Sequence, residues 1–188
     1  MKPKQKLWAI GAGILALFIA SSASASAGGS MAALSYLGAD NLPLGWSRNN
    51  PGNIVRGVNY KGEVYDDFSR FAKFESWAYG IRAMIVLLRK YITTGSSYPN
   101  QCVTTPQNTV RLIVTQWAPP RSCGGDNDDA VVEKYIQFVS AKTGFQANAK
   151  LSADKNTLRK IVQAMSWYEQ GRECVTLAQF NYAYENLI

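Results

Sequence analysis

Apolar side chains recur at helical spacing in several separate stretches of this 188-residue chain, and this pattern limits its possible folds most strongly. In the first stretch Ser76 can cap the start and Gly95 closes the run. Its apolar positions are Trp77, Ile81, Met84, Ile85, Leu88 and Ile92. Further helices are predicted to open at Thr105-Pro106, near Asp126 to Asp129, at Asn156-Thr157, and over residues 176–187. The sequence therefore predicts a mainly helical body.

Between Ile54 and Phe74 the pattern changes to one that is typical of short strands. Ile54-Val55 and Val64-Tyr65 favour extended structure, and the segment from Gly57 to Gly62 is rich in turn residues. We expect a small hairpin or three-stranded sheet here. A helical body with one small β element is an α+β fold. The domain is expected to span residues 47–188, after a linker or short helix at residues 31–46.

The first thirty residues have the composition of a targeting segment. Lys2, Lys4 and Lys6 precede an apolar run, and small residues follow up to Ala25-Ser26-Ala27, which predicts a cleaved export signal. A retained signal-anchor is the alternative, because residues 7–27 are about long enough to span a bilayer. In either case we expect the chain to cross a membrane. The domain would then lie in the periplasm or cell wall, stay membrane-anchored, or be associated with a virion.

The amino-acid composition limits which catalytic groups and which binding partners this chain can have. The chain has no histidine, which excludes Ser-His-Asp and Cys-His nucleophiles and His-based zinc sites. An enzyme with this sequence would transfer protons mainly through its 13 carboxylates. The net charge of +7 favours an anionic partner such as the bacterial wall polymer. The basic residues form no block, so nucleic-acid binding is not predicted.

Two of the three cysteines bracket one predicted helix. In an exported chain, Cys102 and Cys123 are expected to form a disulfide, worth roughly 3 kcal/mol through loop closure. Two free buried thiols are the alternative. Cys174 is left without a partner.

One carboxylate lies on an apolar helix face. The stripe of the fourth helix is Leu158, Ile161, Val162 and Met165, and its next position is Glu169. Burial and the C-terminal end of a helix both raise a carboxyl pKa, as a general acid near neutral pH requires. The alternative is a glutamate that swings outward to pair with Arg172 or Arg159.

The other acids are placed less clearly. Glu63, Asp66 and Asp67 lie in or beside the expected sheet, where solvated turn acids are common. The Asp126 to Asp129 segment lacks the spacing of a calcium loop and suits the start of a helix. No metal or cofactor is predicted.

The stretch SRNNPGNI, residues 47–54, holds three amides, a proline and a glycine, and indicates a turn. It begins a series of motifs that occur in order: RNNPGNI, YKGEVYDDFSRFAKFESWAYGIRAMIVLLRKYI, WAPP, and DN before KYIQFVSAKTG. Together they resemble a family of phage and prophage proteins named after a structural, wall-lysing protein of enveloped double-stranded RNA phages. The resemblance covers about residues 47–171. Where that family commonly ends its last matching helix with His-Glu-x-Gly, this chain has Tyr168-Glu169-Gln170-Gly171.

This resemblance implies a lysozyme-like, lytic-transglycosylase-like fold that acts on peptidoglycan. RNNPGNI is also similar to a stretch of flagellum-type glucosaminidases that closely follows the catalytic glutamate. Only Asp40 precedes it here among acids, so we infer a permuted arrangement with the Glu169 helix beside this turn in space.

On this interpretation Glu169 is the general acid in cleavage of the MurNAc–GlcNAc strand, and a hydrolase would need a second carboxylate, Asp66 or Glu63. The candidate sugar-binding residues are Asn49, Asn50, Asn53, Tyr65, Trp117 and Tyr168. The alternatives are a murein endopeptidase and a non-catalytic, membrane-anchored virion or wall-binding protein. The sequence does not predict an oligomeric state.

Overall fold

A computed structural model describes residues 43–188 of the chain, except residue 58 and residues 66–68. The predicted signal or anchor, most of the linker, and Asp66 therefore lie outside the described residues. Over the described part of the chain, no helix is both long and apolar enough to span a bilayer.

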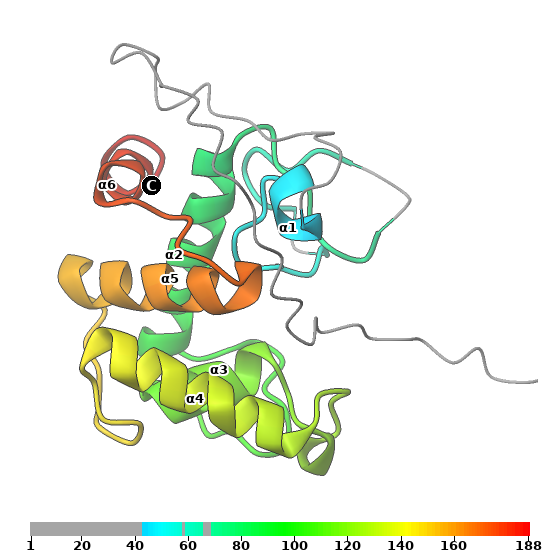
Figure 1. Cartoon of the computed structure of the whole chain (residues 1–188), viewed down its shortest axis with the longest axis vertical. Helices are drawn as coiled ribbons and strands as arrows, with labels where there is room; N and C mark the ends of the chain where they lie inside the picture. Colours follow the sequence, from blue (N-terminus) through cyan, green and yellow to red (C-terminus); the bar gives the residue numbers. More distant parts are fainter. Residues whose placement is uncertain (1–42, 58, 66–68) are drawn as a thin grey trace, which may run out of the picture.

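Helices make up the regular structure of the described residues (Figure 1). They are α1 (Leu44–Ser47), α2 (Trp77–Thr93), α3 (Val110–Trp117), the short 3₁₀ helix η2 (Arg121–Cys123), α4 (Asp129–Thr143), α5 (Lys155–Gln170) and α6 (Leu177–Asn186). The five longer helices are those that the apolar periodicity predicts.

Capping side chains set where several helices begin. Thr109, Asp128, Asp154 and Thr176 each accept a hydrogen bond from a backbone N–H in the first turn of the helix that follows. Helix α3 starts later than the Thr105-Pro106 prediction because Thr109 supplies the capping oxygen, to Leu112 N at 3.2 Å. Local hydrogen-bonding chemistry thus places the helix boundaries.

The α+β prediction is wrong. Across the described part of residues 54–74 there is no strand, only isolated antiparallel bridges that pair Val55 with Phe71 and Glu63 with Phe74. Where we expected a hairpin or three-stranded sheet, the chain forms an irregular loop that doubles back on itself. Asn59, Gly57 and Gly62 adopt positive φ angles there, which interrupt extended structure.

Side-chain hydrogen bonds supplement the backbone hydrogen bonds of this loop, such as that from Ala72 N to Ile54 O at 2.8 Å. Arg48 donates from Nε and Nη2 to Phe71 O, and Asn49 Nδ2 donates to Phe74 O at 3.0 Å. Asn50 Nδ2 donates to both Ile54 O and Ala72 O at 2.9 Å. Amide and guanidinium groups thus satisfy several carbonyls of this loop. Together with a few backbone hydrogen bonds they pair the two chain segments without forming strands.

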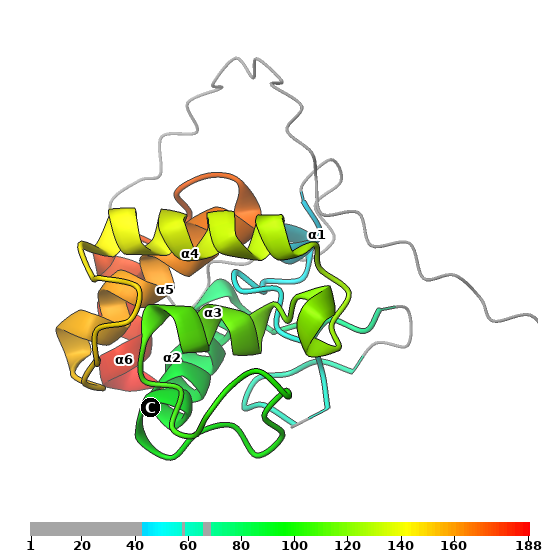
Figure 2. The same ribbon diagram turned by 90° about the horizontal axis from the view of Figure 1, so that it is seen from below.

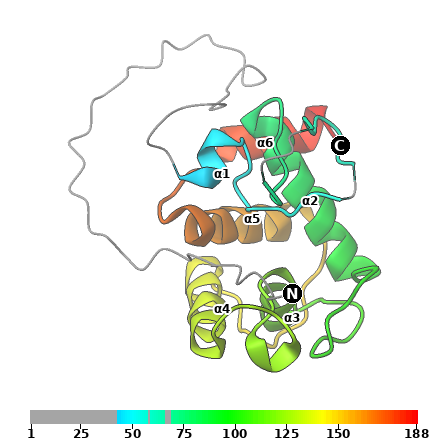
Figure 3. The same ribbon diagram turned by 90° about the vertical axis from the view of Figure 1, so that its right-hand side faces the viewer.

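Helix α5 is central to the arrangement. It packs against α1, α2, α4 and α6. Figures 1 and 3 show it running between α4 on one side and α1 and α6 on the other, and Figure 2 shows α3 beside α4. Fully buried side chains from α2, α3, α5, α6 and the loop before α2 form one core: Phe74, Ile81, Leu88, Ile113, Leu158, Met165 and Phe180. The C-terminal end of α5 lies next to α1 and the 48–54 loop, which brings distant segments together.

Candidate functional site

Glu169 occupies the last turn of α5, at the end of the buried stripe. Leu158, Ile161, Val162 and Met165 of that stripe are each at most 1% exposed, and Glu169 is part-buried. The outward-facing alternative is not adopted. Arg159 donates instead to Gln163 and Asn156, and the Arg172 guanidinium lies 4.3 Å from the Trp46 ring centroid.

Asn53 and Tyr135 hold the Glu169 carboxyl group by hydrogen bonds. Asn53 Nδ2 donates to Oε2 at 3.0 Å, and Tyr135 OH bonds to Oε1 at 3.0 Å. Asn53 belongs to the 48–54 loop and Tyr135 to α4, so each oxygen has a partner from a different part of the chain. The hydrogen bond between Asn53 and Glu169 shows that the C-terminal end of α5 lies beside the SRNNPGNI turn.

The environment raises the pKa of Glu169 to about 7, from an ordinary value of 4.5. Burial of the carboxyl group is the largest cause; hydrogen bonds from Asn53, Tyr135 and Trp117 act in the opposite direction. The group is therefore close to half protonated at neutral pH. A carboxyl with that pKa can both give and take a proton under those conditions.

The loop that carries Asn53 is built by its other asparagines. Asn49 and Asn50 are completely buried, and their amides bond backbone carbonyls within the protein. Asn50 Oδ1 also accepts from Ile54 N at 2.8 Å. Asn53 has a left-handed φ of 48°, which turns its side chain toward α5. Of the three candidate sugar-binding asparagines, the structure thus gives two an internal, structural role and brings Asn53 to the carboxyl.

Two candidate aromatic residues lie at this site. Trp117, the last residue of α3, donates from Nε1 to Gly52 O at 3.1 Å and so ties α3 to the 48–54 loop. Tyr168 stacks on Tyr135 with ring centroids 3.9 Å apart, and its hydroxyl donates to Val131 O at 3.3 Å. Both rings are part-exposed.

The described contacts of the remaining candidates, Glu63 and Tyr65, do not involve Glu169. Glu63 Oε2 accepts from Tyr60 N at 2.9 Å and so closes a local turn. Tyr65 is 80% exposed, with the Arg56 guanidinium 5.5 Å from its ring centroid. Asp66 lies outside the described residues. Within the part of the chain that the structure describes, no group of three or more Cys, Asp or Glu side chains could hold a metal ion.

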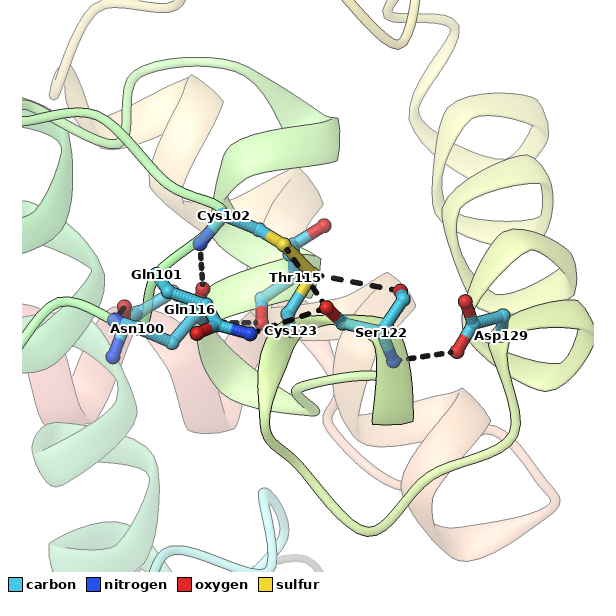
Figure 4. The surroundings of a disulfide bond; sticks show 8 residues. All are labelled: Asn100, Gln101, Cys102, Thr115, Gln116, Ser122, Cys123 and Asp129. Atoms are coloured by element: carbon cyan, nitrogen blue, oxygen red, sulfur yellow. Dashed lines mark hydrogen bonds between the residues drawn. A yellow bond between two sulfur atoms is a disulfide. The ribbon is translucent and has the colours of Figure 1, made fainter.

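The predicted disulfide between Cys102 and Cys123 is confirmed, with Cα atoms 5.3 Å apart. Figure 4 shows how it joins the loop before α3 to η2 after it. Asn100 Nδ2 donates to Thr115 O at 2.8 Å, which holds the same loop against α3. The segments that flank α3 are therefore joined covalently. Cys174 is a free, buried thiol.

Sequence reasoning missed two residues of the site, Tyr135 and Gln170. Tyr135 has the signature of an ordinary core position on α4, and it is 2% exposed. Gln170 follows Glu169, and its Nε2 donates to Pro51 O at 3.0 Å. A buried hydroxyl on an apolar stripe was the available signal for Tyr135, because such a group needs a hydrogen-bond partner.

Comparison with known proteins identifies a phage relative. The chain is 30% identical over 146 residues to Protein P5 of Pseudoalteromonas phage PM2, which covers 75% of this chain and 79% of that protein. The chain belongs to the family of this phage protein. No model of a known protein family matches it.

Proposed function

We propose that this protein is a peptidoglycan-degrading enzyme that cleaves the glycan strand between N-acetylmuramic acid and N-acetylglucosamine, with Glu169 as its general acid. The wall-lysing family that the motifs resemble supplies the substrate class. The phage relative agrees with a role in infection or host lysis. The observation that carries the proposal is a hydrogen-bonded carboxyl with a pKa of about 7 at the meeting point of three segments.

The proposed reaction starts with Glu169 in its protonated form. Its proton passes to the glycosidic oxygen as the bond between that oxygen and the muramic acid C1 breaks. The resulting carboxylate is stabilised by Asn53 Nδ2 and by the Tyr135 hydroxyl, which both lie at hydrogen-bonding distance. Trp117 and Tyr168 offer part-exposed aromatic faces beside the acid, where a sugar ring can stack.

Two ways of completing the reaction differ in the nucleophile. In a transglycosylase, the 6-hydroxyl of the muramic acid attacks C1, and the Glu169 carboxylate takes its proton. A hydrolase needs a second carboxylate, for which Asp66 and Glu63 are the candidates. Glu63 is engaged in its own turn with Tyr60, which favours the transglycosylase.

The test is clearing of purified cell wall in a zymogram. Glu169→Gln is expected to abolish clearing, because an amide cannot donate and retrieve the proton; the loss should be on the order of 10² to 10⁴ in rate. Glu173→Gln, which changes an exposed glutamate just beyond the same helix, is the matched control and should clear normally. Full clearing by Glu169→Gln would contradict the assignment.

Mass spectrometry of the soluble products separates the two chemistries. A transglycosylase releases muramic acid ends that are lighter by one water than those from a hydrolase. Cut peptide bridges with intact glycan would favour a murein endopeptidase. A wild-type protein that binds wall without clearing it would favour the non-catalytic wall-binding role.

A further inference from the structure

Gln170 is buried beside the catalytic candidate and contacts the loop that carries Asn53. The residue is 6% exposed, and its Nε2 donates to Pro51 O at 3.0 Å. The same nitrogen donates to Asn53 Oδ1 at 3.4 Å. One amide group therefore links the backbone of the turn to the side chain that bonds Glu169.

These bonds have a fixed direction. A backbone carbonyl such as Pro51 O can only accept a hydrogen bond, so it must face the NH₂ end of the Gln170 amide. That NH₂ group can only donate, so it must face the oxygen of the Asn53 amide. The Asn53 NH₂ group is then left to face Glu169 Oε2.

We propose that Gln170 is a positioning residue that fixes the Asn53 amide, and thereby keeps Glu169 Oε2 unprotonated and the acidic proton on Oε1. An oxygen that accepts from an NH₂ group gains nothing from carrying a proton toward it. This inference rests on the proposed function, which gives the Glu169 proton its use.

Tyr135 completes the arrangement on the other carboxyl oxygen. Its hydroxyl lies 3.0 Å from Glu169 Oε1 and 3.4 Å from Met165 O. When Oε1 carries the proton, the hydroxyl accepts from it and donates to Met165 O. When Glu169 is ionised, the hydroxyl donates to Oε1. Both protonation states of the acid thus keep a partner.

The packing around Gln170 is consistent with a selected orientation. Its Oε1 accepts no hydrogen bond from the described residues. Gly45 leaves room for the amides, because a Cβ atom there would lie 2.5 Å from Gln170 Oε1 and 2.7 Å from Asn53 Oδ1. The turn therefore accommodates this amide pair closely, although one buried acceptor is left without a partner.

None of the groups that face Glu169 changes its protonation in the pH range where Glu169 titrates, so the Glu169 titration can be measured without interference. They are Asn53 from the loop, Trp117 from α3, Tyr135 from α4 and Tyr168 from α5. Only the two tyrosines titrate, and burial raises the pKa of both above the ordinary value of 10. Both stay neutral while Glu169 titrates.

The experiment measures the Glu169 pKa by NMR of protein labelled with ¹³C at the glutamate carboxyl, without wall substrate. Gln170→Met keeps the size of the side chain and removes its amide, so the Asn53 amide loses its orientation. We expect the pKa of Glu169 to rise by about one pH unit. The upper limb of the activity–pH profile should move by the same amount.

Gln163→Met is the matched control. Gln163 also lies on α5 and donates from Nε2 to a backbone carbonyl, Val175 O, at 3.0 Å, and none of its hydrogen bonds involves Asn53 or Glu169. It should leave the Glu169 pKa unchanged. An unchanged Glu169 pKa in Gln170→Met, or an equal rise in Gln163→Met, would overturn the role of Gln170.

A measurement on the wild-type protein covers the case in which Gln170→Met does not fold. The Asn53 side-chain NH₂ signals should shift with the same midpoint as the Glu169 carboxyl. NH₂ signals that stay constant through that titration would overturn the proposed direction of the bonds. Because no wall is present, this outcome is independent of whether Glu169→Gln still clears peptidoglycan, which tests the proposed function.

Discussion

Single residues at the site link protonation to stability. In the folded protein Glu169 has a pKa of about 7, raised mainly by burial from the ordinary 4.5 of an exposed carboxyl. Between these two pH values the folded state keeps a proton that the unfolded state has released. Folding is therefore most favourable below about pH 4.5, and the advantage is lost as pH rises through 7.

The loss of stability with rising pH gives a prediction for Glu169→Gln, because the amide of this variant does not titrate. The variant should match the wild type near pH 4 and exceed it at pH 8, by up to about 3 kcal/mol in free energy of unfolding. Urea denaturation at the two pH values measures the difference. A difference that does not change with pH would contradict the raised pKa.

Tyr135→Phe tests the second partner of the carboxyl. The ring and its stacking on Tyr168 at 3.9 Å are kept, and only the hydroxyl at 3.0 Å from Oε1 is lost. This hydrogen bond lowers the pKa of Glu169, so the variant should have a higher one. The upper limb of the activity–pH profile should move up by about one pH unit. A profile that moves down, or stays in place, would argue against the bond.

At the scale of elements, the end of α5 positions the acid. Gly171 closes the helix with a φ of 71°, a left-handed conformation that an alanine adopts at a cost of about 1 kcal/mol. A Cβ atom there would meet no atom within 4 Å, so the cost is conformational rather than steric.

Gly171→Ala is therefore expected to lose about 1 kcal/mol of stability and also part of the activity, because Glu169 and Gln170 form the last turn. Gly144→Ala is the matched control. Gly144 ends α4 with a φ of 77° and equally open space. It should lose similar stability and keep full activity. Thermal unfolding and wall clearing of both variants make the comparison. Equal activity in the two would mean that the α5 terminus tolerates distortion.

The 48–54 loop is the second element of the site, and it shows why asparagine is used repeatedly. Asn49 and Asn50 bond the carbonyls of Phe74, Ile54 and Ala72, so the loop holds its shape without a sheet. That fixed shape presents Asn53 to Glu169 across 116 positions of sequence. The Asn49 and Asn50 amides thus stabilise the turn, and the Asn53 amide forms a hydrogen bond with the Glu169 carboxyl group.

For the whole molecule, the disulfide is the covalent restraint on the α3 region. Cys102 and Cys123 close a loop with a sequence separation of 21, which is worth roughly 3 kcal/mol. The double Cys102→Ser, Cys123→Ser variant should unfold at correspondingly lower urea concentration. It should also lose activity earlier than the intact protein on heating, because Trp117 lies on the restrained helix. Identical unfolding of the wild type with and without reductant would contradict a stabilising role.

The sequence by itself determined the helices, the disulfide pair and the position of Glu169 on a buried stripe, whereas Ser76 makes no capping hydrogen bond and α3 begins later than predicted. These features depend on local periodicity, on side chains next to a helix start, and on the spacing of Cys102 and Cys123. Such signals are contained in short stretches of the chain. The same local logic predicted strands over 54–74 and was wrong there, because the competing hydrogen bonds come from Asn49 and Asn50 outside that stretch.

Only the tertiary structure decided which side chains form hydrogen bonds with the acid. Tyr135 is 34 residues from Glu169, and Asn53 is 116 residues away. Their contacts arise because α4 and the 48–54 loop pack against the same end of α5. A buried carboxyl takes its pKa from the neighbours that exclude water and donate hydrogen bonds, and those neighbours are assembled by packing. The sequence indicated the acid, and the fold supplied the surroundings that place its pKa near neutrality.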